Sequence, residues 1–205
     1  MIQLFSPGNV GQRAFLFGVA SLLLGCSLTA TIPPSGVALS KENRSSIRSV
    51  SIAHDVALPY EVRCVGNYGG SCGGAQILQA QTREVGRVVR DHFEATLRRA
   101  EVFPSVVAEG GDAEFTLWAR RVILMVTPGI CGFMGNCFMT FVEVEGVLRT
   151  SDGTILWQQR APGFGPRKHA LREYRDSPEL LREDFAVAAR AAVERLVDGI
   201  EDDRP

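Results

Sequence analysis

Residues 113–160 have the sequence AEFTLWARRVILMVTPGICGFMGNCFMTFVEVEGVLRTSDGTILWQQR. Residues 113–126 are strand-like, with alternation from 114 to 119, and 140–149 alternate again, which is the period of a strand with one buried face. Ser151-Asp152-Gly153 is typical of a hairpin turn, and residues 154–160 return as another strand. We therefore predict an antiparallel meander of three strands.

The polar positions of these strands carry charge. Arg120 and Arg121 interrupt the alternation and indicate a bulge. Glu143 and Glu145 share a strand face with Arg149, so paired carboxylates for catalysis are one interpretation. The other is a solvated face on which opposite charges compensate, and it is the one we expect.

Two amphipathic segments flank the meander. Between residues 77 and 102 apolar residues recur mostly at three- and four-residue steps, and Pro104 ends the run. Ser177-Pro178-Glu179 is a helix start, with serine as N-cap and proline at the first helical position. Residues 47–53 and 60–64 alternate as strands. The fold class predicted is α+β: a mostly antiparallel four- to five-stranded sheet with two amphipathic helices packed on one face.

The N-terminal segment is different in composition. Residues 14–25 follow Arg13 and carry no charge, which is too short for a membrane-spanning helix but typical of a signal peptide. Leu23, Leu24 and Gly25 before Cys26 resemble the bacterial lipobox. The resemblance implies cleavage before Cys26, a diacylglycerol on its thiol and usually a further acyl chain on its amine, which together anchor a protein firmly. Ser27 in place of aspartate implies, by resemblance to Gram-negative lipoproteins, the periplasmic face of the outer membrane.

The domain organisation follows from these features. We expect a signal peptide over residues 1–25 and a flexible tether over 26–45, where Pro33-Pro34 and Ser35-Gly36 break any period. Residues 46–205 would then form a single periplasmic α+β domain.

Four further cysteines suggest disulfides in an oxidising compartment. Pairs Cys64–Cys72 and Cys131–Cys137 would each close a glycine-rich loop, and bridges between the two loops are the alternative. The spacings do not fit a zinc finger or ribbon, and nothing indicates a cofactor, so we expect neither metal nor cofactor.

One motif suggests an enzyme. Ser71 lies in Gly69-Gly70-Ser71-Cys72-Gly73, which matches the G-x-S-x-G of serine hydrolases, and Asp112 or Asp152 followed by His169 would complete the order. However, glycine-rich sequence matches this motif easily, and the preceding strand alternates instead of being continuously apolar. We expect no enzyme, with a periplasmic serine hydrolase as the alternative.

The distribution of charge gives little further indication of function. With 22 basic and 23 acidic residues the chain gives no reason to expect nucleic-acid binding. Arg167, Lys168 and Arg172 form a basic loop that is a candidate for contacting an anion.

The layout also resembles small envelope lipoproteins: the auxiliary lipoproteins of ABC-type transport systems, the lipopolysaccharide-assembly lipoprotein and curli-secretion-type lipoproteins. The resemblance is carried by Ile47-Arg48-Ser49-Val50, the hairpin 151–157 and the final helix after Ser177-Pro178. It implies an accessory subunit of an envelope transport or assembly system, with the lipid in the membrane and an envelope protein as partner. None of the families' site residues carries over.

Overall fold

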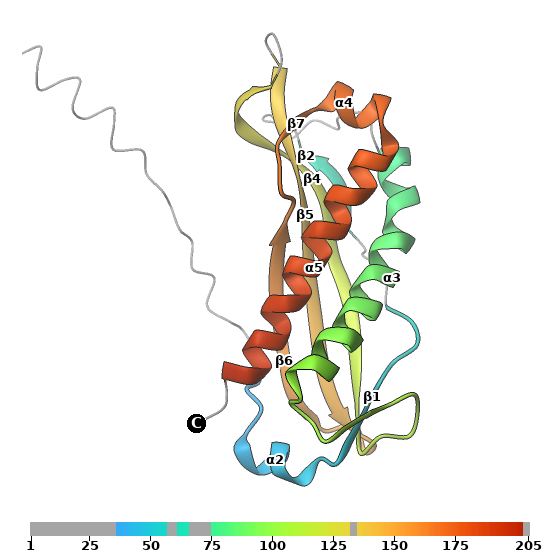
Figure 1. Cartoon of the computed structure of the whole chain (residues 1–205), viewed down its shortest axis with the longest axis vertical. Coiled ribbons are helices and arrows are strands. Elements are labelled where there is room, and N and C mark those ends of the chain that lie inside the picture. The colour runs from blue at the N-terminus through green and yellow to red at the C-terminus, as the bar shows by residue number, and fades with distance from the viewer. Residues whose placement is uncertain (1–35, 57–60, 66–74, 132–134, 203–205) are drawn as a thin grey trace, which may run out of the picture. The chain divides into compact units, whose positions relative to one another are not determined.

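The computed structural model describes residues 36–56, 61–65, 75–131 and 135–202. The predicted signal peptide, Cys26, Ser71 and Cys72 lie outside these ranges, and their roles stay predictions. The described residues form one sheet with helices on one face (Figure 1).

The centre of the sheet is a long hairpin. Strands β4 (Ala113–Cys131) and β5 (Gly135–Thr150) pair antiparallel, and β6 (Ile155–Phe164) pairs antiparallel with the other edge of β5. The predicted meander is confirmed, and its strands are longer than predicted. The predicted bulge is also confirmed, because the β4–β5 register shifts between Ala119 and Arg121.

Shorter strands extend both edges of the hairpin. Strands β1 (Ser49–Ile52) and β2 (Glu61–Val65) pair parallel to different halves of β4, and β3 (Ser105–Val107) pairs parallel to β1. Strand β7 (His169–Ala170) pairs antiparallel to β5. The described strands form a mixed sheet of seven, whose long central pairings are antiparallel. The predicted α+β class is confirmed, while the strand number exceeds the four to five expected.

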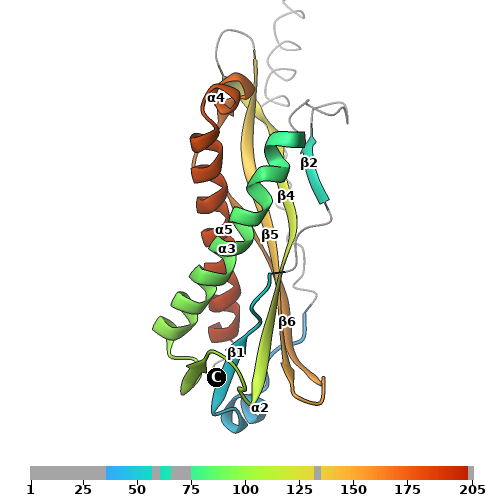
Figure 2. The same cartoon turned by 90° about the vertical axis from the view of Figure 1, so that its right-hand side faces the viewer.

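Two long helices cover one face of this sheet. Helices α3 (Ala75–Ala100) and α5 (Pro178–Asp202) lie side by side there, as the edge-on view shows (Figure 2). Helix α5 begins at the predicted Pro178. Residues 161–176, in which sequence patterns indicate no regular structure, contain the end of β6, β7 and the short helix α4 (Leu171–Asp176). None of the described helices is long and apolar enough to cross a bilayer.

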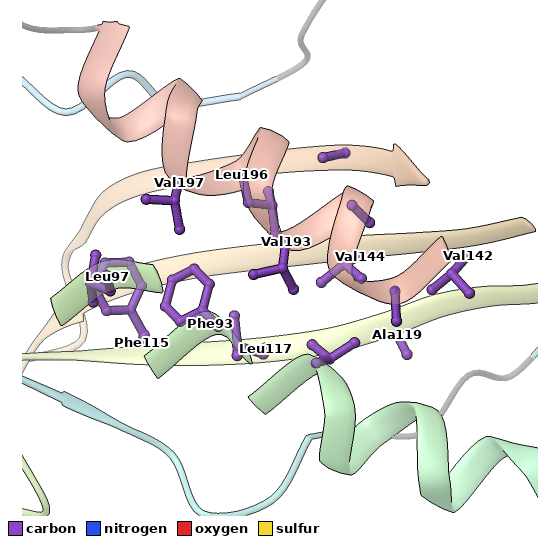
Figure 3. Packing of buried hydrophobic residues seen from close by; sticks show 14 of the residues in the cluster. Phe93, Leu97, Phe115, Leu117, Ala119, Val142, Val144, Val193, Leu196 and Val197 are labelled. Carbon is purple, nitrogen blue, oxygen red and sulfur yellow. The ribbon is translucent and has the colours of Figure 1, made fainter. Parts of the chain in front are cut away.

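Buried aliphatic and aromatic side chains fill the core between helices and sheet (Figure 3). The ring of Phe115 meets the rings of Phe93 and Trp157 edge to face, with centroids 5.1 and 5.9 Å apart. Trp157 lies over Gly146, where a Cβ would come within 2.8 Å of the indole. Such edge-to-face contacts add to the stabilisation from apolar burial.

Small residues let α5 approach the sheet closely. Ala188, Ala189 and Ala192 are fully buried. At Gly163 of β6, a Cβ would overlap the carbonyl oxygen of Ala188. Helix α5 therefore lies directly on the backbone of β6, as expected from its alanines.

The packed domain begins earlier than residue 46. Within the segment expected to be a tether, Val37 pairs with Gln158 of β6, and Leu39 is only 2% exposed in the core. Helix α2 (Lys41–Ser46) follows, and the hydroxyl of Ser40 accepts a hydrogen bond from the amide of Asn43 at its start. A single edge bridge and one short helix have no repeating pattern in the sequence, which is why the boundary was placed too late.

Candidate functional site

The sheet face opposite the helices carries a group of apolar side chains near the β4–β5 turn. Val142 and Val144 of β5 point into the core, so by alternation Phe141 lies on the opposite face. Phe141 pairs with Ile123 on one side and with Phe164 on the other. We call this group the apolar patch; its members are Ile123, Met125, Met139, Phe141 and Phe164.

The apolar patch is partly open to solvent. Phe164 is 40% exposed, and its ring centroid lies 5.2 Å from that of Phe141. The other members are half-buried. Single exposed apolar residues are ordinary on protein surfaces, but a contiguous group marks a surface suited to contact.

A buried carboxylate lies on the same face, next to the patch. The side chain of Glu145 is 1% exposed, yet it accepts hydrogen bonds from Arg120 and Gln158 and lies 3.3 Å from the guanidinium of Arg160. Burial acts to raise the pKa of Glu145. The hydrogen bonds from Gln158 and Arg120 and the charges of Arg120 and Arg160 outweigh it and hold that pKa below the usual glutamate value.

These contacts correct our expectation of a solvated face at Glu145. Charge compensation is present, but the compensating groups are Arg120 and Arg160. Arg149 instead lies over the ring of Trp118 at 5.9 Å, with Arg120 over the same ring at 5.0 Å. Since both oxygens of Glu145 accept hydrogen bonds, this carboxylate stays ionised and has a structural role.

The predicted basic loop lies on the surface. Arg167, Lys168 and Arg172 are all exposed, and the loop follows Phe164 of the apolar patch directly in the chain. Arg172 forms an ion pair with Asp176 at 3.3 Å across one turn of α4. The loop thus places cations next to an apolar surface, and its contact with an anion stays a prediction.

A buried polar network beneath this loop was missed by sequence reasoning. The hydroxyl of Tyr174 donates a 2.7 Å hydrogen bond to Oδ2 of Asp184, and both side chains are buried. Burial raises the pKa of the Tyr174 phenol, and the bond to Asp184 raises it further. The hydroxyl of Thr140 donates to the carbonyl oxygen of Asp184 at 3.0 Å. The network fastens α4 and α5 to β5.

His169, the histidine of the serine-hydrolase alternative, lies beside this network. Its Nδ1 lies 2.7 Å from Oε2 of Glu173, and its Nε2 lies 3.5 Å from Oδ2 of Asp184 and is buried.

The aspartates considered for that alternative lie at the other end of the sheet. His169 is opposite Phe138 on β5, whereas Asp112 and Asp152 adjoin the end of β5 at Thr150. At about 3.3 Å per residue these ends are about 40 Å apart. Asp112 accepts hydrogen bonds from the backbone amides of Arg48 and Ser49, and these bonds lower its pKa. Asp152 accepts hydrogen bonds from the Thr150 hydroxyl and the Thr154 amide, which lower its pKa in the same way. Both are structural.

Of the four cysteines in the predicted disulfides, the structure describes the side chain of one. Cys137 is 2% exposed and disulfide-bonded. The side chains of Cys64, Cys72 and Cys131 lie outside the described residues, so the pairing stays a prediction. Among the described side chains, no group of three or more histidine, cysteine, aspartate or glutamate residues is placed to hold a metal ion.

No model of a protein family matches this chain, and no curated protein matches its sequence. Three solved structures are similar in arrangement. The minor lipoprotein from Acinetobacter baumannii is 6% identical, with 77% of this chain and 94% of that chain covered and a TM-score of 0.43. A DUF330 protein from Xanthomonas campestris is 12% identical (74% and 81% covered, TM-score 0.39), and the PelC dodecamer from Paraburkholderia phytofirmans is 10% identical (80% and 88% covered, TM-score 0.37).

Proposed function

We propose that this chain is a non-enzymatic lipoprotein, anchored through Cys26 at the periplasmic face of the outer membrane, and an accessory subunit of an envelope transport or assembly system. The observation that carries the docking role is the apolar patch on the helix-free face of the sheet. The lipobox-like Leu23-Leu24-Gly25-Cys26 supports the anchor.

The chain length between anchor and domain supports a role close to the membrane. The packed domain reaches Val37 through its pairing with Gln158. Residues 27–36 can span at most about 35 Å when fully extended. Val37, at the start of the packed domain, would therefore lie within that distance of the anchor.

The chemistry around the patch indicates what kind of partner fits. Phe141 and Phe164 offer aromatic surface, and the basic loop beginning at Arg167 supplies exposed cations beside it. Interfaces commonly combine an aromatic centre with a charged rim. The partner that we propose is therefore an envelope protein whose surface is apolar in the middle and carries carboxylates at its edge.

The anchor is tested with Cys26→Ser. Cells fed an alkyne-bearing palmitate should label the wild type and not the variant, and the wild type should fractionate with the outer membrane. If both forms fractionate alike and neither takes up label, the lipoprotein assignment is wrong.

The docking role is tested by a photo-crosslinking amino acid placed at Phe164 in the full chain. Val187 on α5 is the matched control, because it is apolar and 36% exposed but lies on the helical side. We expect one envelope protein to be captured repeatedly from Phe164 and not from Val187. That protein, once purified, should bind the chain at least tenfold more weakly after Phe164→Asp and unchanged after Val187→Asp. Equal capture from both sites contradicts the proposal.

A further inference from the structure

A cavity of about 380 Å³ lies between α3 and the segment that follows β1. The charge of its lining is positive, because arginines outnumber acidic residues there. The residues that line it are His54, Asp55, Val56, Arg83, Gly86, Arg87 and Arg90.

Three of the arginines of helix α3 lie on one face of the helix. Arg83, Arg87 and Arg90 are spaced by four and three residues, so they share one side of the helix over two turns. Gly86 is buried among them and has no side chain to fill the space. The cavity is thus open beside these arginines.

Two of these arginines lack an acceptor within the described part of the chain. Arg87 forms an ion pair with Glu84, but neither Arg83 nor Arg90 has a hydrogen bond or ion pair there. The Nε of Arg90 is buried without a hydrogen-bond acceptor. A buried donor without a partner is unfavourable, and native proteins avoid it.

The charges that face the cavity do not cancel. Among the described residues that line the cavity, Asp55 is the one acid, against three arginines and His54. Glu84, which does not line the cavity, forms an ion pair with Arg87. At least one guanidinium group is left to attract an anion.

We propose that this cavity binds a phosphate-type oxyanion through Arg83 and Arg90. A guanidinium group donates two parallel hydrogen bonds to phosphate oxygens, and the buried Nε of Arg90 would gain its acceptor. The volume lies within the range of small-molecule sites and exceeds that of a single phosphate. It leaves space for a substituent on the phosphate, such as the glycerol of a phospholipid headgroup.

This site is separate from the basic loop. Arg167 and Lys168 are exposed on the loop and Arg172 is exposed on α4, and none of the three lines the cavity. The proposal is also independent of the accessory role, because it rests on α3 and not on the apolar patch.

The test measures the thermal unfolding of the full chain carrying Cys26→Ser in a non-ionic detergent, followed by tryptophan fluorescence. One arm adds inorganic phosphate against chloride at equal ionic strength. The other compares micelles doped with phosphatidylglycerol and with phosphatidylcholine. We expect a saturable rise in Tm, because a ligand that binds only the folded state stabilises it. A rise with inorganic phosphate indicates a small soluble oxyanion, and a rise only with phosphatidylglycerol indicates a lipid headgroup.

The variants decide whether the cavity is responsible. Arg83→Gln with Arg90→Gln should weaken the apparent Kd at least tenfold. Arg99→Gln with Arg175→Gln removes the same charge from exposed positions outside the cavity and should leave the Kd within twofold. If the cavity pair fails to fold, Arg83→Lys with Arg90→Lys keeps the charge but loses the two-pronged geometry, and it should also weaken binding. Absence of a saturable rise in both arms, or equal weakening by the cavity and control pairs, overturns the proposal.

Discussion

Arg120 donates a hydrogen bond from its Nε to Oε2 of Glu145, and Arg120 is the residue that the β4–β5 register skips. The bulge leaves Arg120 without a partner in the ladder, so its side chain lies on the helix-free face together with that of Arg121. A carboxylate that is almost fully buried is thereby kept ionised on a sheet face that has no long helix over it.

Glu145→Gln is expected to lower the free energy of unfolding by about 1–3 kcal/mol at pH 7, because it removes the charge that Arg120 and Arg160 bind. The pKa of Glu145 is lowered in the folded state, so its contribution is present above the pKa of the unfolded chain, about 4.3, and is lost as the pH falls through the lower folded value. Urea unfolding at pH 7 and at pH 3–4 should show the difference between wild type and variant shrinking.

Glu143→Gln is the control for that experiment. Glu143 lies 3.6 Å from Arg121, whose side chain is 51% exposed, so solvent screens this pair. Its loss should cost less than about 1 kcal/mol. Equal losses at the two positions, or a loss at Glu145 that does not change with pH, would contradict the role given to Glu145.

Gly163→Ala is expected to destabilise the domain by about 1–3 kcal/mol, because the new Cβ meets the backbone of α5 at Ala188 and one element must move. Phe164→Ala, at the next residue, truncates an exposed ring and should have a smaller effect. Thermal and urea unfolding measure both. A Gly163→Ala protein as stable as the wild type would show that α5 does not lie on β6 as described.

Long elements were predictable because their patterns repeat. Strands β4, β5 and β6 alternate over many residues, and α3 and α5 keep a helical period. The bulge was also visible, since Arg120 breaks the alternation. A local sequence pattern does not reveal which strand pairs with which. That is why the parallel pairing of β1 and β2 with β4 was not predicted.

The polar sites were harder to predict for the same reason. Glu145 has the sequence context of a solvated strand position, and its burial depends on Arg120, Gln158 and Arg160 from two other strands. The arginines of α3 occupy ordinary polar positions of an amphipathic helix. They line a cavity only together with the segment that carries His54, which is distant in sequence.

Ser71 is expected not to react with a serine-directed fluorophosphonate probe. The histidine proposed as its base, His169, has its Nδ1 beside Glu173 and its Nε2 buried beside Asp184, and the two aspartates considered are about 40 Å from it. The purified full chain should be labelled no more strongly than a Ser71→Ala control. A band that disappears on Ser71→Ala would establish the hydrolase alternative.

Tyr174→Phe is expected to lower the free energy of unfolding by about 1–2 kcal/mol, because Asp184 loses its hydrogen-bond donor inside the protein. The pKa of Tyr174 is raised in the folded state, so its stabilising contribution is complete below the pKa of the unfolded chain, about 10, and declines as the pH rises above it. Absorbance at 295 nm reports phenol ionisation. While circular dichroism shows the fold intact, wild type and variant should titrate identically. Once the chain is unfolded in denaturant, the wild type should show the ionisation of three tyrosines and the variant that of two. An additional tyrosine that ionises in the folded wild type would mean that Tyr174 is accessible to solvent and that α4 is not fastened to α5 through Asp184.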